Sequence, residues 1–304
     1  MLTGPFLCHG VSWDRSGPSL ALATPPGAPA SLPLENLPAV FGFRLLGDRG
    51  ARFCLGYSKV LGPKDRRSFP CPEQTTAERG YQCGPCFARD DFRFMHDVHR
   101  SGVAPPGLAA YLAQEHWLYV ATFADGATKV GTASHRSKWS RLTEQGAVVA
   151  RYVARADDGR IVRVLEDAAT RHAGLPQAVR SAAKTAALAR PRAPRDLDVL
   201  NAAAADGLRQ LLAADVGIDG FETVEEQWDP PGSWEQVLTA RASVYPLSFE
   251  TGDHGGAVLA LLGQTALIAV PEGRFLLNLA LLRGRRVELG EFRSAPIAVQ
   301  DELF

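Results

Sequence analysis

Four cysteines within a short polar stretch constrain the fold of this chain more than any other feature. They are Cys54, Cys71, Cys83 and Cys86, and the last two form the sequence CGPC. The surrounding residues 58–86 are polar, so this stretch lacks an apolar core of its own. Four thiolates around Zn²⁺ make a closed tetrahedral site, and such a site can fold a segment without a core. The pattern therefore predicts a structural zinc module.

Other interpretations of these cysteines stay open. CGPC is also typical of thioredoxin-like redox sites, which need a strand before the first cysteine and a helix after the second. The four thiols could instead be unrelated, and His96 and His99, three apart in a predicted helix, could replace one of them as a ligand. Cys8 lies far from the group in sequence and is expected to be a buried apolar residue.

The charge of the chain is balanced overall but unevenly distributed. The 304 residues carry equal numbers of cationic and anionic side chains. Residues 129–195 hold 14 Lys and Arg against 5 Asp and Glu, and residues 196–304 hold 7 against 17. A basic block suits a phosphate-bearing partner, DNA or RNA. The alternative is that the two blocks face each other within the fold, or are merely solvated.

Composition and patterning predict an α+β protein in three consecutive parts. Residues 1–106 are expected to form β-hairpins and the four-cysteine zinc module, residues 107–230 a mixed α/β domain, and residues 231–304 a small all-β barrel or sandwich. Helices are expected at about 160–174, 177–190 and 196–214. No apolar run is long enough to span a bilayer, and the first residues do not read as a secretory signal. A cytoplasmic protein without membrane contact is expected.

The stretch from His116 to Leu142 reads as strand, turn, strand and a basic helix. The sequence ADGA makes the turn, which brings Tyr119 and Lys129 near each other at the two ends of YVATFADGATK. Arg141 follows on the predicted helix, and a carboxylate, Glu166, comes later on the amphipathic helix IVRVLEDAATRH. His135 lies just after the second strand and is a candidate general base.

These residues resemble the paired motifs of the GIY-YIG superfamily. Trp117-Leu118-Tyr119 stands where that family has its first triplet, and Lys129-Val130-Gly131 stands where it has the second. Arg141 and Glu166 match the arginine and the carboxylate of the two following helices, so the resemblance covers residues 115–170. The whole chain also resembles the family known as domain of unknown function 2797, through KVGT, QGA (145–147) and a late GQ…LI strand (263–268).

The resemblance implies a GIY-YIG-like nuclease that hydrolyses phosphodiesters in DNA or RNA. Tyr119 would act as a base on the attacking water or orient it, and Arg141 would balance charge on the phosphate. Glu166 would hold one catalytic divalent ion, Mg²⁺ or Mn²⁺. Gly131 would permit close approach of the backbone.

Lys129 departs from the family pattern, because the second triplet has a tyrosine at this position. A lysine can contact phosphate or lower the pKa of a neighbour, but it lacks the hydrogen-bond geometry of a phenol. A catalytically altered protein that binds nucleic acid, or a small-molecule enzyme reusing the same cleft, is therefore an alternative. These residues could also have purely structural roles. Tyr119 would then be an ordinary strand aromatic, Arg141 a surface cation, and Glu166 a partner of Arg163 or His172.

Overall fold

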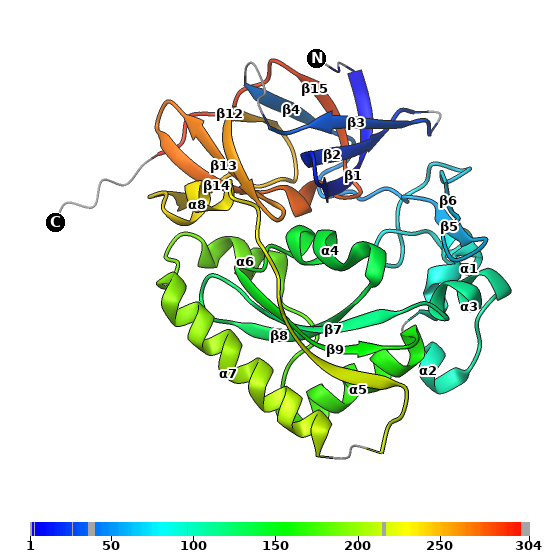
Figure 1. The fold of residues 1–304 in the computed structure, drawn as a ribbon. Coiled ribbons are helices and arrows are strands. Elements are labelled where there is room, and N and C mark those ends of the chain that lie inside the picture. Colours follow the sequence, from blue (N-terminus) through cyan, green and yellow to red (C-terminus); the bar gives the residue numbers. More distant parts are fainter. Residues whose placement is uncertain are drawn as a thin grey trace. The chain divides into compact units, whose positions relative to one another are not determined.

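The computed structural model describes residues 2, 4–25, 27–35, 40–95, 97–214 and 217–298. The chain divides into two compact units (Figure 1), of which the first comprises Met1–Gly56, Pro70–Gly84 and Gly232–Phe304 and the second Tyr57–Phe69 and Pro85–Pro231. The fold is mixed α+β, as predicted, with strands as the larger part of the first unit. The division differs from the three consecutive parts expected, because the two ends of the chain belong to one unit.

One nine-stranded sheet builds the first unit, in the order β11-β14-β13-β12-β4-β15-β1-β2-β3. Neighbouring strands are antiparallel except β11 and β14, which run parallel. The strands are β1 (Gly4–Asp14), β2 (Gly17–Ala23), β3 (Pro29–Pro33), β4 (Phe41–Leu46), β11 (Ser243–Val244), β12 (Asp253–Leu262), β13 (Thr265–Val270), β14 (Gly273–Asn278) and β15 (Arg286–Gly290). Two short helices accompany them, α8 (Trp234–Leu238) and the 3₁₀ helix η3 (Leu279–Leu282).

The C-terminal strands β11 to β14 are neighbours in this sheet, but β15 lies between the N-terminal strands β4 and β1. Leu289 of β15 pairs with Gly4 of β1 on one side and with Phe43 of β4 on the other. Sequence periodicity identifies such strands but does not identify their partners, since pairing depends on residues more than 200 positions apart. The expected all-β tail is therefore part of a larger sheet shared with the N-terminal segment.

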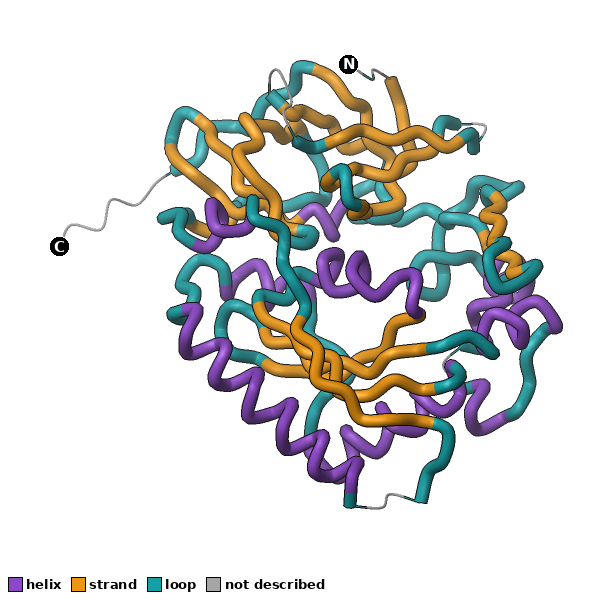
Figure 2. The backbone as a smooth tube through the Cα atoms, viewed as in Figure 1, coloured by secondary structure: helices purple, strands orange, loops and turns teal. Residues whose placement is uncertain are grey.

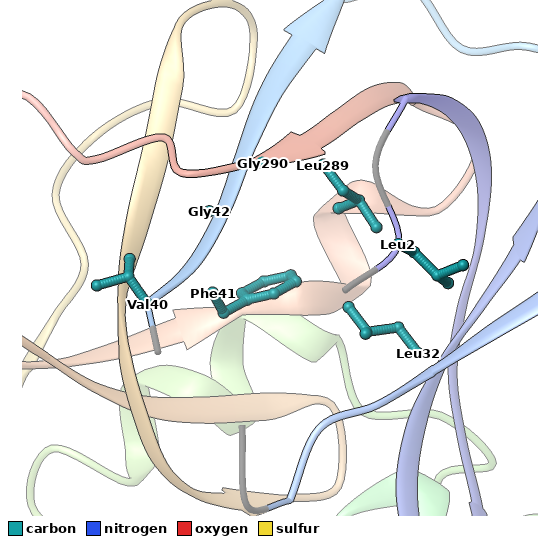
Figure 3. A pocket seen from close by; sticks show the side chains of 7 residues that line it. All are labelled: Leu2, Leu32, Val40, Phe41, Gly42, Leu289 and Gly290. Atoms are coloured by element: carbon teal, nitrogen blue, oxygen red, sulfur yellow. The ribbon is translucent and has the colours of Figure 1, made fainter. Parts of the chain in front are cut away.

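A small apolar pocket lies in this sheet (Figure 3). Its side chains come from β3, β4, β15 and the residues beside them. The lining consists of Leu2, Leu32, Val40, Phe41, Gly42, Leu289 and Gly290. None of these seven residues is polar or charged, so the pocket is a packing feature and offers nothing to an anionic ligand.

A four-stranded antiparallel sheet forms the centre of the second unit, in the order β10-β9-β7-β8. Its strands are β7 (His116–Thr122), β8 (Thr128–Ser134), β9 (Val149–Ala156) and β10 (Phe221–Gln227). Its main helices are α4 (Lys138–Gln145), α5 (Gly159–Ala173), α6 (Ser181–Ala187) and α7 (Pro194–Ala213). The smaller elements are β5 (Tyr57–Val60), β6 (Arg66–Phe69), α1 (Gly84–Arg89), η1 (Asp91–Phe94), α2 (Val98–Ser101), α3 (Pro106–Leu112) and η2 (His135–Ser137).

Helices α5 and α7 cover one face of this sheet, and α4 lies on the other (Figures 1 and 2). Leu118 and Val120 of β7 pack with Leu165 of α5 and Leu208 of α7 in the core of the unit. Because side chains alternate along a strand, Tyr119 points to the opposite face. There it meets Gln145 of α4. One face of β7 thus packs into the core, and Tyr119 on the other face is directed toward α4.

Local signals explain the elements that carry the predicted site. The hairpin is confirmed, with Gly126 at a φ of 92° in the turn and the Asp125 carboxylate accepting a hydrogen bond from the amide of Ala127. The helix expected at 160–174 is confirmed as α5. The Asp158 side chain caps its first turn, and Gly174 ends it in the left-handed conformation with a φ of 67°.

Candidate functional site

The four predicted zinc ligands come together in space. Cys54, Cys71, Cys83 and Cys86 are all buried, and their Sγ atoms lie within 4.8 Å of one another. Those of Cys71 and Cys83 are 3.9 Å apart. A tetrahedral ion with Zn–S bonds of about 2.3 Å separates its sulfur ligands by roughly 3.8 Å. The arrangement can therefore hold a metal ion and is compatible with structural zinc.

Backbone amides support the cysteine cluster. The amide of Cys83 donates to the Sγ atom of Cys54 at 3.2 Å, and that of Gly56 donates to the same atom at 3.4 Å. Such N–H···S bonds stabilise a thiolate and fix its direction, as the outer partners of a metal site do. The donor set and its hydrogen bonds therefore fit a closed Zn²⁺ site better than four unrelated thiols.

The other interpretations of the cysteines find less support. No disulfide joins any of the five cysteines, all of which the structure describes. The residues before Cys83 form an isolated bridge between Arg79 and Gln82 instead of the strand that a thioredoxin-like site needs. His99 pairs with Asp167 at 3.1 Å, and His96 lies outside the described residues. Cys8 is buried as expected, and burial raises its pKa to about 12.

Tyr119 occupies the middle of β7 and is fully buried. It pairs with Gly131 across the hairpin, and a Cβ atom at Gly131 would lie 2.4 Å from the Tyr119 hydroxyl. The missing side chain at Gly131 thus makes room for the phenol. The side-chain amide of Gln145, the last residue of α4, donates a hydrogen bond of 2.7 Å to the phenol oxygen.

The environment of Tyr119 keeps its phenol protonated. Burial raises the pKa of Tyr119 above its ordinary value, and the charge of Arg141 together with the hydrogen bond from Gln145 opposes this only in part. The nearby charge of Glu166 raises the pKa further. At neutral pH the residue can therefore orient a water molecule, but it is a poor proton acceptor.

Lys129 lies in β8 on the same face as Tyr119. Its Nζ atom is 5.6 Å from the centroid of the Tyr119 ring and donates a hydrogen bond of 3.1 Å to the carbonyl of Gln177. Burial, and then the charge of Arg141, lowers the pKa of Lys129 to about 8, while the charge of Glu166 acts in the opposite direction. The amine therefore sits in an environment that already holds excess positive charge.

Glu166 is buried on α5. Its Oε2 atom accepts a hydrogen bond of 2.6 Å from Arg163 one turn earlier, so the local pairing considered from the sequence is confirmed. Its charge nevertheless reaches both Tyr119 and Lys129, because it acts on the pKa of each. Arg141 acts on the same two groups from α4 and is itself exposed. Tyr119, Lys129, Arg141 and Glu166 are thus close enough to interact electrostatically.

His135 belongs to a different set of contacts. Its Nδ1 atom lies 2.9 Å from the carboxylate of Glu115, which also receives hydrogen bonds from Trp117 and Arg155. The ring of His135 is tilted against that of Trp117, with the ring centroids 6.3 Å apart. These partners belong to the start of β7 and to β9, and none of them is Tyr119. A base role for His135 stays a prediction.

Three polar residues that sequence reasoning did not place in the site belong to it. Lys184 of α6 donates a hydrogen bond of 3.0 Å to the backbone carbonyl of Gln145, and its Nζ atom lies 4.3 Å from the centroid of the Phe123 ring. Burial, followed by the charges of Lys129 and Arg141, lowers the pKa of Lys184 to about 7. Gln145 and Arg163 are the other two. Lys184 gave only a weak signal in the sequence, a single cation within an alanine-rich helix.

Lys138 of the basic segment has a structural environment instead. Its Nζ atom lies 3.2 Å from the ring centroid of Trp117 and 4.3 Å from that of Tyr152. It also pairs with the carboxylate of Glu226 at 2.6 Å. This cation–π and ionic pairing ties α4 to β7, β9 and β10, so Lys138 is less available to a phosphate than Arg141.

Comparisons of the chain with protein-family models, with curated proteins and with solved structures found no match. The described residues contain no helix that is both long and apolar enough to cross a membrane. The resemblance to the GIY-YIG superfamily therefore stays a prediction.

Proposed function

We propose that this protein is a metal-dependent phosphodiesterase of the GIY-YIG-like type, acting on DNA or RNA. The observation that carries the proposal is that Tyr119 and Lys129 lie on one hairpin and that Arg141 of α4 and Glu166 of α5 act electrostatically on both. A buried phenol, an exposed guanidinium and a buried carboxylate are the groups that metal-assisted phosphodiester hydrolysis needs.

Each residue has a role that its environment supports. Tyr119 is held by Gln145 and stays protonated, so it orients the attacking water instead of taking its proton. Arg141 is exposed and can reach the phosphate, where its charge would stabilise the transition state. Glu166 would hold a Mg²⁺ or Mn²⁺ ion, which supplies Lewis-acid activation of water and phosphate. Arg163 fixes the direction of that carboxylate.

The partner proposed is nucleic acid, because Lys129, Arg141 and Glu166 of the site belong to the basic block of residues 129–195. Binding through phosphates should weaken as salt concentration rises. The four-cysteine cluster would be a structural zinc site outside this chemistry. A cytoplasmic location, where thiols stay reduced, would suit four cysteines that form no disulfide.

A specific observation favours a second function, static binding of nucleic acid without cleavage. The carboxylate of Glu166 is already paired with Arg163, and a neutralised carboxylate is a weaker metal ligand. Lys129, in place of a tyrosine, suits contact with phosphate. In this case the protein binds nucleic acid in a salt-dependent manner, and divalent ions produce no cleavage.

The decisive experiment compares cleavage and binding. Labelled single- and double-stranded DNA and RNA are incubated with the protein and Mg²⁺ or Mn²⁺, and products are separated by electrophoresis. Glu166→Gln keeps an acceptor for Arg163 but removes the charge that binds metal, so cleavage should fall at least about 100-fold with binding retained. Exposed Glu225 lies on β10 of the same unit, and Glu225→Gln is the matched control. Cleavage that persists in Glu166→Gln excludes the proposed mechanism, and salt-sensitive binding without cleavage by the unmodified protein establishes the second function.

A further inference from the structure

Gln145 links Tyr119 to a lysine on a separate helix. Its side-chain amide donates to the Tyr119 hydroxyl at 2.7 Å, and its backbone carbonyl accepts from Lys184 Nζ at 3.0 Å. Gly146, which ends α4 in the left-handed conformation, fixes the position of this last residue. The amine of Lys184 is thereby brought to the predicted site, although α6 lies beyond the part of the chain that resembles GIY-YIG proteins.

Lys129 and Lys184 concentrate positive charge in a poorly solvated place. Lys129 is buried and Lys184 is half-buried. The charge of Arg141 lowers the pKa of both amines, and the charge of Lys129 also lowers the pKa of Lys184. In the part of the chain that the structure describes, the polar partner of each amine is a neutral backbone carbonyl and not a carboxylate. Glu166 offsets part of this positive charge, but its carboxylate is already paired with Arg163. Cations that are poorly solvated and only partly compensated are unfavourable, and an oxyanion would supply further negative charge.

We propose that Lys129, Lys184 and Arg141 form a binding site for a phosphate group, in which Lys184 is a substrate-binding residue. The proposal rests on the proposed function for its substrate, a phosphodiester of nucleic acid. The new element is Lys184, which would recognise the phosphate together with Lys129 and Arg141. Inorganic phosphate should therefore bind even without a divalent ion. A phosphate group has several acceptor oxygens, so the two amines need not share one, and Gln145 links Lys184 to Tyr119.

A purely structural role for Lys184 makes a different prediction. A cation that donates to the last carbonyl of α4 also caps that helix and interacts favourably with its dipole. Loss of the cap would lower the melting temperature of the protein and leave its affinity for phosphate unchanged. Affinity for inorganic phosphate therefore separates the two roles, whereas stability alone does not.

The test is isothermal titration calorimetry of the full chain with inorganic phosphate at low ionic strength and without added divalent ions. The unmodified protein should bind phosphate, and Lys184→Met should weaken binding at least about tenfold. Exposed Lys64 in the same unit gives the matched control, since Lys64→Met removes the same charge and should bind as the unmodified protein does. Lys184→Gln, which keeps a donor for the Gln145 carbonyl, replaces Lys184→Met if the latter does not fold.

Each result decides between the two proposals. Unchanged affinity in Lys184→Met, or no binding of phosphate by the unmodified protein, overturns the phosphate site even if Glu166-dependent cleavage is found. Phosphate binding that depends on Lys184 in a protein that cleaves no nucleic acid supports the site and rejects the hydrolase.

Discussion

The close approach of Tyr119 to Gly131 makes the size of residue 131 decisive for the site. An added Cβ atom would lie 2.4 Å from the phenol oxygen, well inside van der Waals contact, so the Tyr119 side chain would have to leave its bond with Gln145. Gly131→Ala should therefore cost about 1–3 kcal/mol in the free energy of unfolding, as overpacked core positions do. Urea unfolding followed by tryptophan fluorescence measures it.

A double-mutant cycle identifies the cause of that loss. In a Tyr119→Val background the phenol is gone, so Gly131→Ala should cost little, and the coupling between the two positions should account for most of the single-variant effect. An equal cost in both backgrounds would show that Gly131 is needed for a backbone reason unrelated to Tyr119. If the proposed function is correct, Gly131→Ala should also abolish cleavage.

At the scale of elements, the sequence predicted what local signals determine. The turn ADGA and the alternation around it define β7 and β8, and Asp158 and Gly174 define the ends of α5. The contact between Lys184 and Gln145 could not be predicted, because it depends on how α6 packs against α4 across 39 positions of sequence. SAAKTAA alone is typical of a solvated helix, and only the fold brings its lysine to Gln145, whose side chain bonds Tyr119.

The cysteine cluster is the element whose ligand can be tested most directly. Purified protein should contain about one zinc per chain, and Cys83→Ser should lose it, because a hydroxyl is a poor replacement for a thiolate in a closed site. Cys8→Ser is the matched control, since Cys8 is equally buried but lies in β1 outside the cluster. Metal analysis by mass spectrometry after dialysis measures the content. Full zinc retention by Cys83→Ser would rule out the assigned ligand set.

At the scale of the whole chain, the N-terminal and C-terminal segments depend on each other. β4 lies between β12 and β15, and β1 lies beside β15, so both N-terminal strands need partners from beyond residue 250. The cysteine-bearing stretch also depends on hydrogen bonds with residues beyond position 250. The amide of Phe53 donates to the carbonyl of Gly284, and Arg286 donates to the carbonyl of Gln74. The organisation in three consecutive parts expected from sequence would have allowed the last part to be removed.

A chain ending at residue 231 tests this interdependence. It lacks β11 to β15, which leaves both edges of β4 and one edge of β1 without their hydrogen-bonding partners, and exposed strand edges promote aggregation. We expect low soluble yield and, in any soluble fraction, rapid amide exchange in β1 and β4 and loss of zinc. A chain ending at residue 298 keeps every described strand and should behave as the full chain does. Slow exchange in β1 and β4 of the shorter chain, with its zinc retained, would instead show that the N-terminal strands and the cysteine cluster fold without the C-terminal strands.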